Sequence, residues 1–299
     1  MSNSNNNTFF EKLKPVHGVK LVADEHEPDP FTLMSVLGAA HSKGDGILGF
    51  LNLRSAAALE RVSKEARNEA KKFKWDDIET PIKGSLADWR ASFPKAIAAN
   101  ISGRKDLTDA DFVHLKGIKN LNMSGCNQAT ITDAAFEHLR GIKTLNMSHC
   151  HQVTITDAAF VHLRGIHTLD MSYCSQETIT DAAFEPLRGI HTLEMSYCRQ
   201  RTITDAAFAH LCGIHTLGMR NCNQETITAK IFDGRLGNKL KILDITDCSR
   251  EIITAAYNTY GVEENKTYVL RHKQLGGYKR RTRTKKFRSR TASRKHRKG

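Results

Sequence analysis

The sequence has 299 residues, of which 39% are hydrophobic and 26% are charged, and this composition excludes collagen-like and wholly disordered proteins. The formal net charge is +13, but the segment 271–299 contains fourteen Lys and Arg and no acid, so the segment 1–270 carries 13 minus 14, or −1. A role in binding nucleic acid can therefore be assigned only to the C-terminal tail.

Residues 1–30 form a polar segment that we expect to be disordered. Residues 1–8 are rich in Ser and Asn and lack the apolar stretch of roughly 7–15 residues that a signal peptide needs. No run approaches the ~18 apolar residues of a membrane-spanning helix. The sequence therefore predicts an intracellular protein of the cytoplasm, the nucleus or both, neither secreted nor inserted in a membrane.

Residues 31–94 have the apolar spacing of a small all-α module. Ser55 can cap a helix whose apolar residues recur every three or four positions on one face, at Leu59, Val62, Ala66, Ala70 and Phe73. One interpretation is a helical cap that shields the open edge of the first repeat, which every solenoid needs.

The stretch from Ile47 to Trp75 also resembles an F-box, a short helical module that docks onto the adaptor subunit of a cullin ubiquitin ligase. The residues that carry the resemblance begin with Ile47-Leu48 and Phe50-Leu51-Asn52-Leu53-Arg54-Ser55 and continue with Leu59 and Val62-Ser63-Lys64. The resemblance implies that the adaptor is contacted by Leu48, Phe50, Leu51, Leu53 and Val62. F-boxes are often followed by leucine-rich repeats, and an F-box can also act as a cap, so the two interpretations are compatible.

A twenty-four-residue unit recurs through the segment 95–270 and reads I-x-x-L-x-M-S-x-C-x-Q-x-T-I-T-D-A-A-F-x-x-L-R-G. The alternation of Leu121 and Met123 predicts a short strand with one buried face. Thr132-Asp133 predicts the cap and acidic first turn of a short helix, and Phe136 and Leu139 lie on one face of it. A glycine suited to a left-handed helix exit follows, at positions 117, 141, 165, 189, 213 and 237.

One unit cannot bury its apolar residues alone, so successive copies must stack. The expected fold is an α/β leucine-rich-repeat solenoid with parallel strands on its concave face and short helices on its convex face. Strands are expected near residues 97–99, 121–123, 145–147, 169–171, 193–195, 217–219 and 243–245, with a closing strand at Tyr268–Leu270. The pattern from about 95 to 259 resembles the cysteine-containing leucine-rich repeats.

Six cysteines follow the repeat: five are separated by one full unit each, and the sixth follows after a slightly longer interval, namely Cys126, Cys150, Cys174, Cys198, Cys222 and Cys248. No two are close enough for the usual paired zinc ligands, so we expect half-buried thiols that hydrogen-bond the turn backbone, and no metal or cofactor. Histidines recur at 114, 138, 162 and 210 and at 167, 191 and 215, without a paired carboxylate–His–nucleophile arrangement, so no catalytic site is expected.

Two positions of the unit vary between copies and are expected to point outward from the concave face. The candidate partner-binding residues are Asn122, Asn146, His149, Asp170, Tyr173, Glu194, Tyr197, Asn221 and Asp244. Tyr173 and Tyr197 beside Asp170 and Glu194 make an aromatic–acidic strip, which suggests a basic or polar partner. The alternative is a solvated face. The nearly invariant glutamines at 128, 152, 176, 200 and 224 are interpreted as ladders that brace the turn.

Residues 271–299 form a basic tail that is expected to be disordered. Nuclear import or contact with nucleic acid would use Lys279, Arg280, Arg281, Arg283, Lys285 and Lys286, and a solubilising tail is the alternative. The sequence therefore predicts a non-enzymatic interaction protein. It is either an F-box-type subunit whose concave face recruits a target, or a leucine-rich-repeat scaffold without a ubiquitin link.

Overall fold

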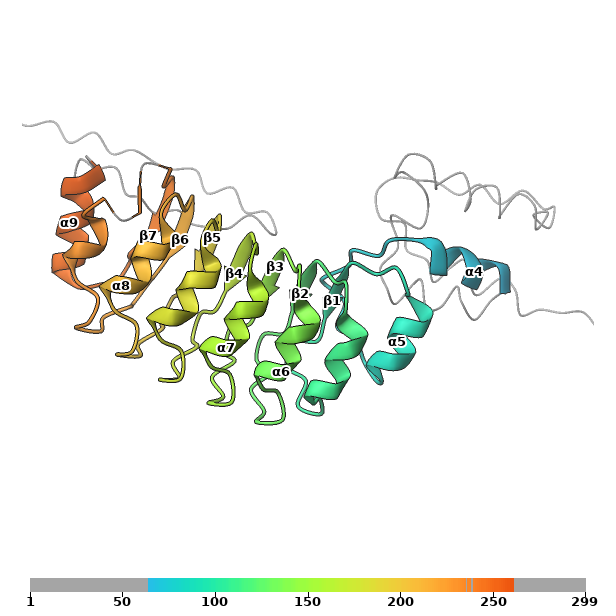
Figure 1. The fold of residues 1–299 in the computed structure, drawn as a ribbon. Helices are drawn as coiled ribbons and strands as arrows, with labels where there is room; N and C mark the ends of the chain where they lie inside the picture. Colours follow the sequence, from blue (N-terminus) through green and yellow to red (C-terminus); the bar gives the residue numbers. More distant parts are fainter. Residues whose placement is uncertain (1–63, 235, 238, 261–299) are drawn as a thin grey trace, which may run out of the picture.

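The computed structural model describes residues 64–234, 236–237 and 239–260 (Figure 1). The predicted closing strand at 268–270, the expected disorder of residues 1–30 and 271–299, and most of the F-box-like stretch lie outside these residues. Within them, no helix is long and apolar enough to cross a membrane.

The described chain is built around one parallel sheet of seven three-residue strands. Their order in the sheet is their order in the sequence: β1 Ala98–Asn100, β2 Asn120–Asn122, β3 Thr144–Asn146, β4 Thr168–Asp170, β5 Thr192–Glu194, β6 Thr216–Gly218 and β7 Ile242–Asp244. The register aligns equivalent repeat positions, so that Leu121 lies beside Leu145 and Leu145 beside Leu169. The seven predicted strands are confirmed, with bounds shifted by one residue. Each strand from β2 to β6 ends before its methionine, and β7 ends before Ile245, because that residue already belongs to a turn closed by the cysteine amide, as in Cys126 N to Met123 O at 3.1 Å.

Short helical turns connect successive strands on the opposite side of the stack. They are η3 Asp109–Leu115, α6 Asp133–Phe136, η4 Glu137–Leu139, α7 Asp157–Phe160, η5 Val161–Leu163, η6 Asp181–Leu187, α8 Asp205–Phe208, η7 Ala209–Leu211 and η8 Ala229–Phe232. The predicted cap is confirmed: the Thr132 hydroxyl accepts a hydrogen bond from Ala134 N at 3.2 Å. The predicted left-handed exit is confirmed as well, with Gly141 at φ +80°.

The core runs along the whole stack as rows of identical side chains. Leu, Met, Ile and Phe of each repeat are buried, and the phenylalanine row is fully enclosed from Phe112 to Phe208, with one ring from each successive repeat. Figure 1 shows the strands following one another along the hollowed side of the curved stack. This is the α/β solenoid that the repeat predicts, because each unit buries its apolar face only against its neighbours.

A second set of bonds joins the repeats along the helical side. The Asp133 carboxylate accepts from Thr156 N at 2.8 Å and from Thr156 Oγ1 at 2.7 Å, one repeat further on. The same pair of bonds recurs at Asp109, Asp157, Asp181 and Asp205. The aspartate that the sequence explains as a favourable first-turn acid therefore also joins neighbouring repeats.

Helices cover both ends of the described stack. At the N-terminal end lie α4, Lys64–Lys72, and α5, Leu86–Ser92, with Trp75 and Phe93 buried beneath them in an edge-to-face pair. The Arg90 guanidinium donates to the carbonyl oxygens of His114, in η3, and of Ala96, just before β1, and so joins α5 to the first repeat. At the other end, α9, Arg250–Tyr260, buries Ile252 and Ala256. Within the predicted helical segment 31–94, the structure describes residues 64–94, and Trp75, Trp89 and Phe93 of this part belong to the buried core that continues into the repeats.

Candidate partner-binding face

The last residue of β2, β3, β4, β5 and β7 is half-buried, whereas Asn100 at the end of β1 is buried and Gly218 at the end of β6 has no side chain. Most of the half-buried side chains also hold their own turn together. The side-chain oxygens of Asn122, Asn146, Asp170 and Asp244 each accept a hydrogen bond from the backbone N–H two residues later, at 2.9–3.0 Å. This is the local side-chain turn that Asn and Asp favour. These four side chains are therefore half-buried and have a structural role in the turn, which the sequence interpretation did not foresee.

Glu194 is the exception in this row, because its longer side chain does not form that turn. It lies against Gly218 on the next strand, where a Cβ atom would overlap its carboxylate. Burial raises the pKa of Glu194 to about 7, and the nearby Asp170 and Asp244 carboxylates act in the same direction. The absence of a side chain at residue 218 thus creates the space that this carboxyl occupies.

The variable residue before each cysteine forms a stack of rings in the centre of the solenoid. The rings of His149 and Tyr173 are 4.3 Å apart at 12°, and those of Tyr173 and Tyr197 are 4.5 Å apart at 7°. Tyr173 is 41% exposed. Beyond Tyr197, the Arg199 guanidinium lies 6.0 Å from the ring centroid and donates to Asn221 Oδ1 at 2.7 Å. The structure therefore brings the predicted aromatic residues together as one surface and adds Arg199.

The backbone at this stacked position has positive φ in every repeat. Glycine occupies it in the first two turns, Gly103 and Gly125, at φ +71° and +70°. His149, Tyr173 and Tyr197 adopt φ values of +60° to +61°, and Asn221 and Asp247 adopt +56° and +59°. The conformation lets each amide donate to the next repeat, as Tyr173 N does to Ser196 O at 2.9 Å. Gly, Asn, Asp and His tolerate this region better than other residues, whereas the bulky tyrosines are strained there.

The six periodic cysteines are more buried than expected, since each is at most 8% exposed. Their thiols donate to the carbonyl of the preceding repeat, as Cys150 Sγ does to Met123 O and Cys174 Sγ to Met147 O, both at 3.2 Å. The expected half-buried thiols are therefore corrected to buried ones that bond between repeats. Among the described residues, no three His, Cys, Asp or Glu side chains are placed to hold a metal ion.

The glutamine rows brace the turns in the first half of the stack. Gln152 Nε2 donates to Cys126 O at 3.1 Å, and Gln176 Nε2 donates to Cys150 O at 3.2 Å. Gln200 and Gln224 are equally buried, but neither amide makes a hydrogen bond within the described part of the chain. The ladder interpretation is thus confirmed for the earlier repeats only.

Cysteine reactivity should separate the repeat positions from the seventh cysteine. Cys212 is exposed, whereas burial raises the pKa of the Cys150 and Cys198 thiols to about 12. Because the thiolate is the nucleophile, iodoacetamide at about pH 8 should alkylate Cys212 in the native protein and leave the six others unmodified. Peptide mass spectrometry after native and denatured labelling measures this. Alkylation of Cys174 in the native protein at the rate of Cys212 would contradict the buried row.

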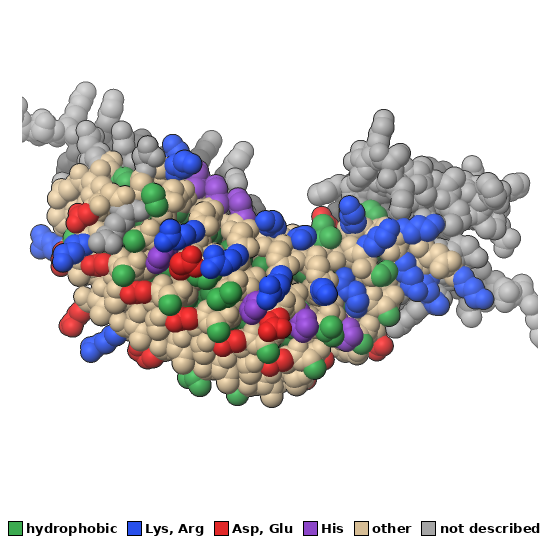
Figure 2. All heavy atoms as spheres, in the orientation of Figure 1, with side chains coloured by type: hydrophobic (Ala, Val, Ile, Leu, Met, Phe, Trp, Pro, Cys, Tyr) green, Lys and Arg blue, Asp and Glu red, His purple; other side chains and the backbone are tan. Residues whose placement is uncertain are grey.

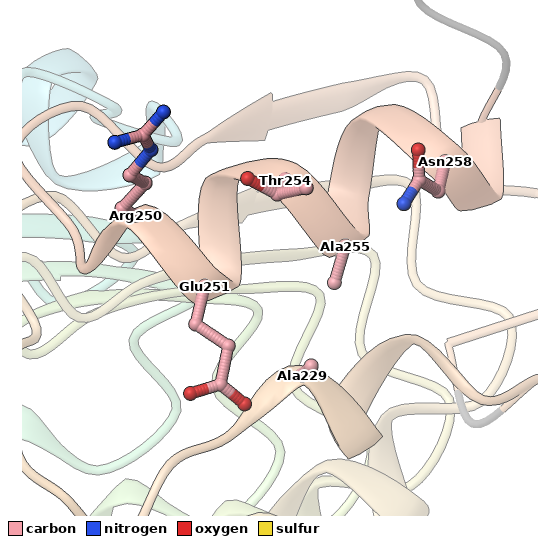
Figure 3. Close-up of a pocket in the computed structure, with 6 residues that line it drawn as sticks. All are labelled: Ala229, Arg250, Glu251, Thr254, Ala255 and Asn258. Carbon is pink, nitrogen blue, oxygen red and sulfur yellow. The ribbon is translucent and has the colours of Figure 1, made fainter.

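A groove of about 460 Å³ lies between α9 and η8 at the C-terminal end (Figure 3). It is bordered by Ala229, Arg250, Glu251, Thr254, Ala255 and Asn258. The labelled side chains include one acid and one base but no nucleophile held by a general base, so this groove has no catalytic arrangement.

No protein-family model matches the sequence, and no curated protein matches it. Solved structures resemble the fold, and three of them are named here. The first is a chain of the TLR13–ssRNA13 complex, with a TM-score of 0.45 and 20% identity, and the match covers 55% of this chain and 23% of that one. The second is a chain of the yeast Rad7–Elc1 complex, with a TM-score of 0.38 and 17% identity over 49% of this chain and 42% of that one. The third is a chain of the Drosophila Toll–Spatzle complex, with a TM-score of 0.34 and 10% identity over 57% of this chain and 33% of that one. The present chain thus spans less than half the length of each.

Proposed function

We propose that this leucine-rich-repeat chain is a non-enzymatic protein-interaction module of the cytoplasm or nucleus, and that its concave face binds a basic segment of a target protein. The observation that carries the proposal is the His149–Tyr173–Tyr197 stack, held at positive φ beside the carboxylates of Asp170 and Glu194. Exposed tyrosines are frequent anchors of protein interfaces.

The backbone strain is the strongest support for a functional stack. Residues outside their favoured φ region cost on the order of 1–3 kcal/mol and cluster at functional sites. Four of the seven equivalent turns use Gly, Asn or Asp, which avoid most of that cost. Only the three central turns carry bulky rings, and these three rings contact one another. Stacking returns roughly 0.5–1.5 kcal/mol per pair, so it offsets part of the strain without explaining why rings are present.

The charge beside the rings selects the class of target. Asp170, Glu194 and Asp244 lie on β4, β5 and β7, so acids border the stack on the strand side. A Lys or Arg of the target would find a ring edge and a carboxylate within the same surface. Such a cation would also favour ionised Glu194, whose pKa is about 7, and binding should therefore strengthen as the pH rises through neutrality.

We further propose that residues 47–75 make the chain an F-box-type subunit of a cullin ubiquitin ligase, which brings the bound target to the ligase. The adaptor-contacting residues Leu48, Phe50, Leu51, Leu53 and Val62 lie outside the described residues, and the support is their sequence pattern together with its place before the repeats. Tethering of this kind works by raising the effective concentration of the target near the ligase.

Co-purification tests the ligase link. The double substitution Leu51→Asp and Leu53→Asp is expected to abolish recovery of the ligase adaptor from cells, because buried anchors of an interface do not tolerate a charge. The matched control is Val113→Asp with Val161→Asp, at solenoid residues that are 47% and 50% exposed, and it should recover the adaptor normally. If the intact protein never recovers the adaptor, the ligase role is wrong and the scaffold role remains.

The alternative function, import or nucleic-acid contact through the tail, is favoured by the concentration of the net charge in residues 271–299. The residues concerned, Lys279, Arg280, Arg281, Arg283, Lys285 and Lys286, lie outside the described residues. Binding of a labelled oligonucleotide should fall steeply with salt and vanish when residues 279–299 are deleted, because each phosphate contact releases a counterion. Binding that survives the deletion would place the contact elsewhere.

A further inference from the structure

A second row of side chains lies at the opposite end of the strands from the aromatic–acidic strip. The residue immediately before each strand from β2 to β7 is basic or can become so: Lys119, Lys143, His167, His191, His215 and Lys241. The next residue in each repeat is uncharged, being Asn120, Thr144, Thr168, Thr192, Thr216 or Ile242. In six successive repeats, the side chain just before the strand is therefore positively charged or can be protonated, and the residue next to it is not acidic.

The three central members of this row form a continuous stack of imidazoles. The His167 and His191 ring centroids are 4.5 Å apart at 13°, and the His191 and His215 centroids are 4.4 Å apart at 14°. Figure 2 shows adjacent histidine side chains grouped along the hollowed side of the C-terminal half of the described solenoid. Parallel rings at this spacing cannot converge on one metal ion, and they cover one another's faces. What the row presents to a ligand is a line of ring edges.

The strand itself orients these rings. Nδ1 of His167, His191 and His215 lies 3.1, 3.1 and 3.4 Å from the hydroxyl of the threonine that follows each of them. No Nε2 atom of the three makes a hydrogen bond within the described part of the chain. When the threonine hydroxyl donates to Nδ1, the proton of the neutral ring resides on Nε2, which becomes an outward donor. The row then offers three parallel N–H groups at the spacing of neighbouring repeats.

We propose that this imidazole row, extended by Lys143 and Lys241, is a second docking surface that binds an acidic peptide segment of a protein partner, and that binding tightens as the pH falls below neutrality. Carboxylates match a line of N–H donors and gain from each proton that the row takes up. A nucleic-acid backbone fits less well. The same strands carry Asp170 and Glu194 three residues further on, and the covered ring faces leave no platform for bases.

The direction of the pH dependence follows from the neighbours of the central ring. Burial lowers the pKa of His191 from 6.5, and repulsion from His167 and His215 lowers it further. The unliganded fold therefore binds this proton less readily than the unfolded chain does. Its free energy of unfolding falls as the pH drops below about 6.5. An acidic ligand has the opposite influence on the pKa, because its carboxylates stabilise the protonated rings. The ligand therefore binds more tightly at lower pH, where more of the rings are protonated. The lysines of this row are Lys119 and Lys143, whose Nζ atoms donate to Gly141 O at 3.1 Å and to Gly165 O at 3.0 Å, and Lys241. Asp170 and Glu194 lie beyond the threonines.

The test uses the full-length chain and a fluorescein-labelled peptide of ten glutamates, followed by anisotropy at about pH 7.5 and about pH 6.0 at constant ionic strength. We expect the affinity to rise at least about threefold at the lower pH. The triple substitution His167→Gln, His191→Gln and His215→Gln should remove this rise. Lys and Arg of the basic tail remain charged at both pH values, and His272 and His296 of the tail are present in both proteins, so the difference between the intact chain and the triple variant reports the row.

Three comparisons decide the outcome. The control His114→Gln, His138→Gln and His162→Gln removes the same number of imidazoles from the helical side and should keep the rise. Glu194→Gln should also keep it, and loss of the rise in this variant would assign the effect to the carboxyl and overturn the proposal. A row-dependent rise for a ten-nucleotide oligothymidylate in place of the peptide would overturn the proposed partner class. If the affinity of the triple variant at 167, 191 and 215 still rises at the lower pH as in the intact chain, the imidazole row is not a binding site.

Discussion

Replacing Tyr173 and Tyr197 together by Asn is expected to weaken binding of the target at least about a hundredfold. Each buried aromatic anchor of an interface contributes about 2 kcal/mol or more on truncation, and two such losses multiply. Asn retains the positive φ of +61° at both positions, so the turn and its hydrogen bonds to the next repeat are preserved. Lost stacking and relieved strain oppose each other, and the free energy of unfolding should change by no more than about 1 kcal/mol.

This experiment needs the target recovered by affinity purification and identified by mass spectrometry, followed by calorimetry with the purified pair. The matched control is Val153→Asn with Val161→Asn, two exposed apolar residues away from the concave face. It should leave both the affinity and the stability unchanged. If the tyrosine variant binds the target normally, the aromatic–acidic strip is not the binding surface. If it unfolds several kcal/mol more easily, the stack is a structural element.

The substitution Phe160→Ala should lower the free energy of unfolding by about 3–5 kcal/mol, as is usual for a fully enclosed phenylalanine. Phe160 is 0% exposed and stands between Phe136 and Phe184 in the central row of the core. Because each repeat is stabilised through its two neighbours, the cavity weakens two interfaces at once. Denaturant unfolding measures the loss, and a lower cooperativity of the transition should accompany it.

Two variants calibrate that result. Val161→Ala, at the adjoining residue that is 50% exposed, should change the free energy of unfolding by no more than about 0.5 kcal/mol. Phe232→Ala, in the last repeat turn beside α9, should cost less than Phe160→Ala, because fewer repeats depend on it. Equal losses at residues 160 and 232 would contradict the nearest-neighbour description of the stack.

The two proposed surfaces respond to pH in opposite directions, which allows them to be distinguished in one protein. A cationic target at the aromatic–acidic strip gains as Glu194 ionises above a pKa of about 7. An acidic peptide at the imidazole row gains as the histidines become protonated. A partner that engaged both would bind across the width of the concave face, with its basic and acidic parts at the opposite ends of the strands.

Local sequence pattern and the twenty-four-residue period of the repeat together determined the architecture of this protein. The period of Leu121 and Met123, the caps at Thr132 and its equivalents, and the glycines at helix exits each follow from interactions within a few residues. The seven strands, the short helices and the order of the sheet were therefore predictable. The outward direction of Asp170 and Glu194 followed from the same alternation.

The side-chain contacts of the two surfaces became known only from the tertiary structure, because they form between neighbouring repeats. The Asp133–Thr156 bonds, the stacked rings of Tyr173 and Tyr197, and the seat of Glu194 on Gly218 all join residues about one repeat apart. Which residues meet across one full repeat depends on the register of neighbouring strands, and the tyrosines at positive φ donate their backbone N–H to the next repeat. Sequence periodicity predicts that copies lie side by side, but the side-chain environment depends on the contact geometry between them.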